Sequence, residues 1–276
     1  MLTPVILPVF VSLLNAAAAS PDPAALRAAW AEVEPSLRAK GQLSVPSFTE
    51  ADWAKIAQGD VLKRRLPSAG AIDAALGVGF LPYGIDAVWV GILDDVHDDL
   101  VEGLSETWLP GTTPHSKRLY QHLDLPAPFD DRHWAIRVQN TQPLHAATTG
   151  KAWERVWAID PAGQGALNEL PASFLSAADA PNPAEALWTP VNEGGWTLVP
   201  AAGGVIVVYQ VRTDIGGNIP DELVLQYALS TLDDLIEHVG ELAARAPSHY
   251  RAGHYDIVRP GRRACPGVVS GSAELG

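Results

Sequence analysis

One stretch near the end of the chain constrains the fold most strongly: "VRTDIGGNIPDEL", residues 211–223. An apolar, strand-like run ends there at Thr213–Asp214, and a Gly216–Gly217 pair follows. Ile219–Pro220 then opens the strongest helical pattern of the chain, over 219–246. Glycine lets the backbone leave a sheet abruptly, and proline is tolerated in the first turn of a helix. The stretch therefore predicts a sheet that stops and a long helix that packs across it.

The chain before this helix alternates apolar and polar residues with a period of two. We expect strands near residues 103–109, 117–125, 132–141, 151–159, 195–200 and 204–213. Their sequential order and short turns favour one antiparallel sheet, and with the helix they predict an α+β fold. The stretch 160–194 has no period, and a loop of that length in a compact domain is either functional or disordered.

Alternation also predicts which strand residues turn toward the helix, because successive side chains point to opposite faces of a sheet. A ligand held between the sheet and the helix would contact that face. The candidate ligand-binding residues are Gln121, Trp134, Arg155, Trp157, Val207 and Tyr209 on the strands, with Leu223 and Tyr227 on the helix. The polar members Gln121, Arg155 and Tyr209 each need a partner when buried. A ligand headgroup is one such partner, and a position at a strand end or sheet edge is the alternative.

The first 19 residues are apolar to Leu14 and end in Ala17–Ala19, which fits a secretory signal peptide cleaved before Ser20. No Lys or Arg precedes the apolar run, and Pro4 and Pro8 interrupt it, so an uncleaved anchor or a misassigned start codon are the alternatives. We expect export, to the periplasm, and a cytoplasmic location if the signal interpretation is wrong.

The remaining pattern divides the chain into further segments. Helices at 22–40 and from Ser47 or Thr49 predict an N-terminal helical extension over 20–59. The main domain then covers 60–246, with a buried helix over 83–96. Residues 247–276 are rich in Gly, Pro and Arg and are typical of a flexible tail.

Charge and motifs exclude several function classes. The formal net charge of −13 argues against nucleic acid and against docking on anionic membranes. The single cysteine, Cys265, excludes an intramolecular disulfide and a cysteine-based zinc cluster. We expect no metal and no cofactor, because His97 among four Asp is more typical of a solvated helix end than of a cation site. The G-x-S-x-G, P-loop and H-E-x-x-H motifs are absent from the sequence.

Three pieces of the sequence together resemble bacterial START-like proteins. They are "YQHLDLPAPFDDRHWAIRV" (120–138), "WTLVPAAGGVIVVYQVRTD" (196–214) and "GGNIPDELVLQYALSTLDDLIEHV" (216–239). These proteins are StAR-related lipid-transfer domains of the superfamily that includes Bet v 1 proteins and polyketide cyclases. The resemblance covers roughly residues 60–246 and implies a helix-grip fold, in which the sheet curls around the C-terminal helix and leaves an apolar tunnel.

The resemblance implies binding or transport of an apolar ligand, and relatives on this fold include enzymes. Our main hypothesis is a carrier or sensor of a hydrophobic small molecule, such as a lipid, with the 160–194 loop as a gate. One alternative is a cyclase/aromatase-type enzyme that uses Arg155 and Tyr209 in the same cavity. Another is a scaffold protein whose cavity is filled by its own Trp side chains. The sequence leaves the oligomeric state open.

Overall fold

The computed structural model describes residues 20–68, 72–94, 101, 103–113, 115–177 and 180–249. The predicted signal peptide lies outside these residues, as do His97, Cys265 and the tail from residue 250 onward. No helix within the described ranges is both long enough and apolar enough to cross a membrane.

The described strands form one sheet, in the order β1-β2-β9-β8-β6-β5-β4-β3 with β7 beside β5. All pairs are antiparallel except β5 with β7. This confirms the predicted α+β class and antiparallel sheet. The strands are β1 (Leu62–Leu66), β2 (Ala74–Leu81), β3 (Leu104–Trp108), β4 (Ser116–Leu123), β5 (Arg132–Asn140), β6 (Trp153–Ile159), β7 (Leu187–Trp188), β8 (Val191–Ala201) and β9 (Gly204–Asp214).

Strand β2 was not among the predicted strands. Its sequence, AALGVGFL, is apolar throughout, and nearly every residue is buried. One side of the strand packs against the two C-terminal helices, Asp221–Ser230 and Leu232–His249. The other side packs against the two N-terminal helices, Pro23–Lys40 and Glu50–Ala57. A strand covered on both faces has no polar side and therefore no alternation to detect.

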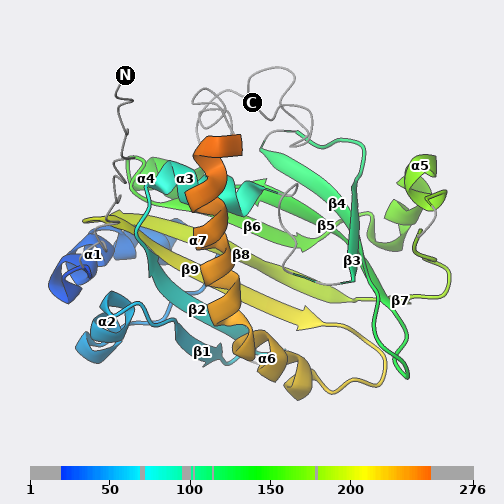
Figure 1. Cartoon of the computed structure of the whole chain (residues 1–276), viewed down its shortest axis with the longest axis horizontal. Helices are drawn as coiled ribbons and strands as arrows, with labels where there is room; N and C mark the ends of the chain where they lie inside the picture. The colour runs from blue at the N-terminus through cyan, green and yellow to red at the C-terminus, as the bar shows by residue number, and fades with distance from the viewer. Residues whose placement is uncertain are drawn as a thin grey trace, which may run out of the picture.

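Three helices cover the face of the sheet that we call the inner face: α3 (Ile85–Leu93), α6 (Asp221–Ser230) and α7 (Leu232–His249). Figure 1 shows α7 crossing this face. Glycines allow the close approach: a Cβ on Gly79 would lie 3.1 Å from Ile236, and one on Gly91 would lie 3.1 Å from the backbone of Ala243. Helix α7 therefore packs tightly onto β2 and α3 at one end of the sheet.

The predicted single helix over 219–246 is two helices that meet at Thr231. The hydroxyls of Ser230 and Thr231 both donate to the carbonyl of Tyr227, at 2.7 and 3.2 Å. Such bonds compete with the helical hydrogen-bond pattern, and here they accompany the break. The inward residues Leu225, Ala228 and Leu232 keep helical spacing across this break, so one apolar face continues from α6 into α7.

The turn between β9 and α6 contains Gly216 and Gly217, and both have positive φ, at 67° and 71°. The predicted role of the pair in leaving the sheet is therefore correct. The buried guanidinium of Arg132, at the start of β5, donates to the carbonyls of Ile215 and Gly216 at 2.8 and 3.3 Å. Arg132 therefore joins the start of β5 to the turn that leads into α6.

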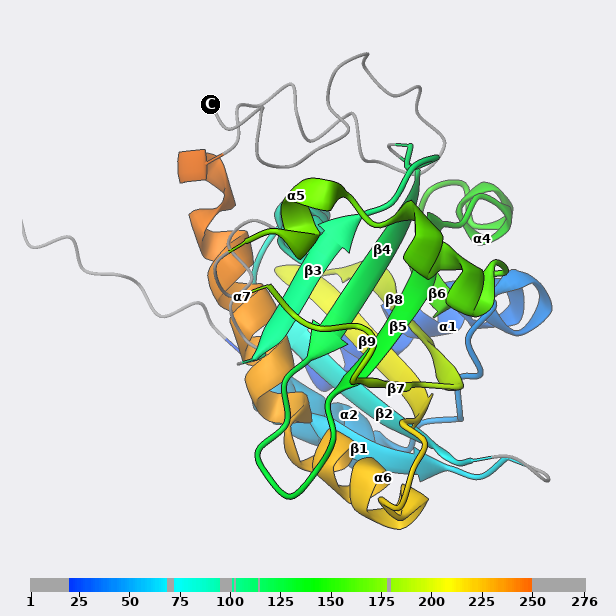
Figure 2. The ribbon, with the colours of Figure 1, turned by 90° about the vertical axis from the view of Figure 1, so that its right-hand side faces the viewer.

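The opposite, outer face is covered by α1 (Pro23–Lys40), α2 (Glu50–Ala57) and α4 (Pro143–Ala147). Figure 2 shows α7 and α1 on opposite sides of the central strands. Asp22 accepts from the Ala24 N–H at the start of α1, and Thr49, one of the two expected starts of the second helix, forms a capping box with Asp52. The N-terminal helices therefore pack on the main domain and share its outer core.

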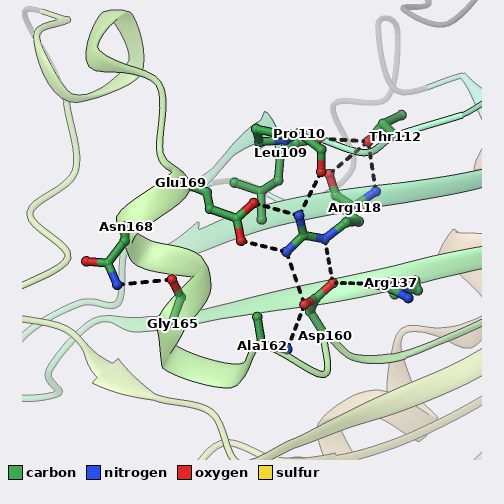
Figure 3. Close-up of polar contacts among 10 residues, drawn as sticks. All are labelled: Leu109, Pro110, Thr112, Arg118, Arg137, Asp160, Ala162, Gly165, Asn168 and Glu169. Carbon is green, nitrogen blue, oxygen red and sulfur yellow. Dashed lines mark hydrogen bonds and ion pairs between the residues drawn. The ribbon is translucent and has the colours of Figure 1, made fainter.

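The stretch 160–194 is held against the outer face near β4 and β5. It contains η1 (Gly163–Glu169) and α5 (Ala172–Leu175), and its apolar residues pack on Tyr120 and Ala135. Arg118 fixes it by donating to Asp160 at 2.8 Å and to Glu169 at 2.6 Å (Figure 3). The expectation that this stretch gates the ligand site is not supported, because most of it lies on the other face of the sheet.

Candidate ligand-binding face

The candidate site is the inner face of β3, β4, β5, β6, β8 and β9. Six of the eight predicted residues lie on it: Gln121, Trp134, Arg155, Trp157, Val207 and Tyr209. Strand alternation placed them correctly, and their role in binding stays a prediction. They come together because consecutive strands are in register across the sheet, so that Arg155 lies opposite Trp196 and Trp196 lies opposite Tyr209.

The two predicted helix residues do not belong to this face. Leu223 is 56% exposed and Tyr227 is 70% exposed on α6. The residues of α6 that turn inward are Leu225, Ala228 and Leu229. The expectation that Leu223 and Tyr227 face the sheet is wrong, because the buried face of α6 runs through Leu225, Ala228 and Leu229 instead.

Near β3, β4 and β5 the inner face is apolar with one short polar network. Leu119, Trp134, Ile136 and Val138 form its buried part, and Leu104, Trp108, Leu123, Trp157 and Ile159 pack against them only partly buried. Trp134 Nε1 donates to Gln121 Oε1 at 2.7 Å, and Gln121 Nε2 donates to Glu106 at 2.9 Å. The amide of Gln121 is therefore used at both ends by the protein, and we no longer assign it to a ligand headgroup.

The cations of this face are also engaged. Lys117 donates to the carbonyl of Leu93 at 3.2 Å and lies 4.8 Å from the ring centroid of Trp108. Arg155 is buried between Asn140 and Trp196, and it is not without a partner.

An aromatic group forms the centre of the face. The ring of Tyr209 lies 4.5 Å from that of Trp196 and 5.7 Å from that of Trp157. Trp157 Nε1 donates to Asn192 Oδ1 at 2.9 Å. Burial raises the pKa of the Tyr209 hydroxyl above its usual range. Aromatic walls with few polar groups are typical of sites for small apolar ligands.

Two residues that position the Trp157 indole, Asn192 and Gly194, were not predicted from the sequence. A Cβ on Gly194 would lie 2.6 Å from the Trp157 ring, so only glycine lets that indole lie over β8. Both residues fall in the stretch assigned to a loop. The missed signal was a continuation of the Trp196–Leu198 alternation two and four residues further back.

A groove lies between the end of β2 and helix α7. It is lined by Leu81, Pro82, Tyr83, Glu237, Gly240, Glu241, Ala244 and Arg245. It is open to solvent and separate from the aromatic group. Among the described residues, His, Cys, Asp and Glu form no group of three or more that could hold a metal ion.

Comparisons with known proteins support the fold. No family model matches the sequence, and no curated protein matches it. The structure is similar to the human StAR-related lipid transfer protein 5, with a TM-score of 0.51 and 12% identity over 80% of this chain and 97% of that one. It is also similar to a STAR-related lipid transfer protein fragment from Xanthomonas axonopodis, with a TM-score of 0.49 and 20% identity over 67% and 98%. The chain therefore has the START-like helix-grip fold of the StAR-related lipid transfer domains.

Proposed function

We propose that the protein binds and carries, or senses, a hydrophobic small molecule, such as a lipid, on its inner face. One observation carries the proposal: apolar side chains of this face remain partly exposed although helices cover the same side of the sheet. They are Leu104, Trp108, Leu123, Trp157, Ile159 and Tyr209. Burying such surface stabilises a complex by roughly 25 cal/mol per Å².

The position of α7 agrees with this proposal. Its main contacts are with α3 and β2, at one end of the sheet. The partly exposed side chains lie mainly on strands toward the other end, β3, β4 and β6. The StAR-related lipid transfer protein with the same fold is named for a lipid cargo, which favours a lipid here as well.

The first test is native mass spectrometry of the purified chain, followed by solvent extraction and identification of any bound molecule. A discrete added mass that extracts unchanged as a lipid supports the carrier function. Conversion of an added ligand to a new product supports the cyclase/aromatase-type alternative instead. A bare mass after incubation with phosphatidylcholine vesicles and with fatty acid esters contradicts both and favours a face filled by its own Trp side chains.

A pair of variants locates the ligand. Leu123→Asp places a charge among the partly exposed apolar residues of β4 and should abolish binding. Leu175→Asp, on α5 against the outer face and already 45% exposed, should leave binding intact. Equal binding by the two folded variants would count against the inner face as the site.

We also propose that the chain is exported, on the strength of the apolar first 19 residues and the small residues before Ser20. N-terminal sequencing of the protein from fractionated cells tests this. A periplasmic protein that begins at Ser20 supports export, and an intact N-terminus in the cytoplasmic fraction contradicts it.

A further inference from the structure

Tyr209 occupies a fixed place at the centre of the inner face. It lies on β9 between Gly77 of β2 and Trp196 of β8. Its ring contacts the rings of Trp196 and Trp157, at centroid distances of 4.5 and 5.7 Å. These two ring contacts restrict the orientation of the Tyr209 side chain and therefore the position of its hydroxyl.

Among the residues that the structure describes, the hydroxyl of Tyr209 has no hydrogen-bond partner. The side chain is only partly buried. Burial also raises the pKa of this hydroxyl, so it remains protonated at physiological pH. It is therefore an O–H donor that faces the same side as the apolar wall.

A second donor, on β8, also lies beside Trp157. Asn192 uses its Oδ1 to accept the Trp157 N–H at 2.9 Å, which directs its Nδ2 away from the indole. This Nδ2 donates to no residue in the described part of the chain. Tyr209 and Asn192 thus offer two donors, both beside the indole of Trp157.

The charges of the inner face argue for an uncharged ligand group. Its cations Lys117, Arg132 and Arg155 are engaged with the protein. The carboxylate of Glu106 adds a negative charge to the face, bound to Gln121. An anionic headgroup would lose its hydration here without gaining a free cation, and this costs more than the transfer of a neutral oxygen.

We propose that the ligand carries a neutral oxygen acceptor, an ester or ketone carbonyl or a hydroxyl, which accepts a hydrogen bond from Tyr209 with Asn192 as a second donor. This inference deepens the proposed function and rests on it. It narrows the ligand class to uncharged lipids with an oxygen function and disfavours free fatty acids and phospholipids whose phosphate would have to reach this point.

The test compares three probes with similar chains: methyl oleate, 1-octadecene and oleate. Each is delivered from cyclodextrin to the full chain, and affinity is measured by native mass spectrometry titration. Tyr209→Phe removes only the hydroxyl. It should weaken methyl oleate binding about 3- to 10-fold, the effect of one neutral hydrogen bond, and leave 1-octadecene binding unchanged. Tyr227→Phe is the matched control, because Tyr227 is 70% exposed on α6, and it should change neither affinity.

The remaining outcomes would contradict the proposal. Unchanged methyl oleate binding by the Tyr209→Phe variant would overturn the proposal and leave the proposed function intact. An equal loss for the ester and the hydrocarbon would also overturn it, because the effect would then come from packing. Oleate bound tenfold more tightly than the ester would exclude a neutral site. If the wild-type protein binds none of the three probes, the proposed function fails as well.

Discussion

The carboxylate of Glu154, near the start of β6, accepts a hydrogen bond from the backbone N–H of Gln42 at 2.9 Å, between residues 112 positions apart in the sequence. The same oxygen lies 3.4 Å from the N–H of Leu43, and the other oxygen accepts from the Thr141 hydroxyl at 2.8 Å. Glu154 is fully buried on the outer face. This one side chain therefore ties the segment between α1 and α2 to the sheet.

Replacing Glu154 with Ala should destabilise the fold by about 3 kcal/mol, because buried donors lose their acceptor and a cavity remains. Glu154→Gln should cost less, since its amide oxygen can keep the bonds to the backbone. Urea unfolding measures both, and hydrogen exchange in α1 reports whether the N-terminal helices loosen first. Glu185→Ala, at an exposed site, is the control. If Glu154→Ala is as stable as this control, the hydrogen bonds of Glu154 do not stabilise the fold.

The ion network around Arg118 gives a second prediction. Arg118 donates to both oxygens of Asp160 and of Glu169, and Asp160 is almost completely buried. Arg118→Ala leaves a buried carboxylate short of its main partner and should cost about 3 kcal/mol. Faster proteolysis between residues 160 and 177 should accompany the loss.

Arg137 provides the matched comparison for this network. Its guanidinium lies 3.6 Å from the same Asp160 but is 40% exposed, so Arg137→Ala should cost under about 1 kcal/mol. Arg118→Lys should restore little, because an ammonium lacks the planar fork that binds two carboxylates. Equal effects of the two alanine substitutions would contradict this account.

Two buried histidines should make stability depend on pH. His122 and His133 lie on the outer face of β4 and β5, and burial lowers the pKa of both. Asp131 and Asp124 partly oppose the shift at His122. As pH falls below about 6.5 the unfolded chain takes up protons first. The free energy of unfolding should therefore decrease from there down to the folded-state pKa values, by at most about 1.4 kcal/mol per pH unit for each group.

Urea unfolding between pH 7.5 and 5.5 checks this dependence against the double variant His122→Asn, His133→Asn, which should show a smaller decrease. The two proteins are compared at equal pH, because Glu154 acts in the opposite direction. Burial raises the pKa of Glu154, so its contribution to the free energy of unfolding is lost as pH rises through its folded-state pKa. The same slope in both proteins would show that the histidines do not set it.

The position of the Trp157 ring in the candidate site should depend on Gly194. In a Gly194→Ala variant the new Cβ would lie 2.6 Å from the Trp157 ring and 2.2 Å from the Gln210 carbonyl, so the indole and the strand must shift. We expect a loss of at least about 1 kcal/mol in stability and weaker ligand binding. Gly165→Ala, where nothing lies within 4 Å, is the control. Unchanged binding in a folded Gly194→Ala variant would remove Trp157 from the site.

The strand faces could be predicted because they follow from local geometry. Alternation along one strand is a property of adjacent residues, so Trp134 with Val138, and Trp157 with Arg155, were placed on the correct face from the sequence. The start of α1 at Asp22 was found for the same reason, and Thr49 was one of two expected starts of α2. Strand β2 was missed because it is buried on both sides, which removes the pattern that identifies a strand.

What the sequence determined by itself is therefore the class of fold, the faces of the strands and the placement of six of the eight candidate residues on the inner face. The tertiary structure decided which polar groups on the inner face have partners. Gln121 is occupied by Trp134 and Glu106, and the Tyr209 hydroxyl is free among the described residues. It also decided the side on which Tyr227 lies. Hydrogen-bond partners and helix phase depend on contacts between residues far apart in the chain, and no local period records them.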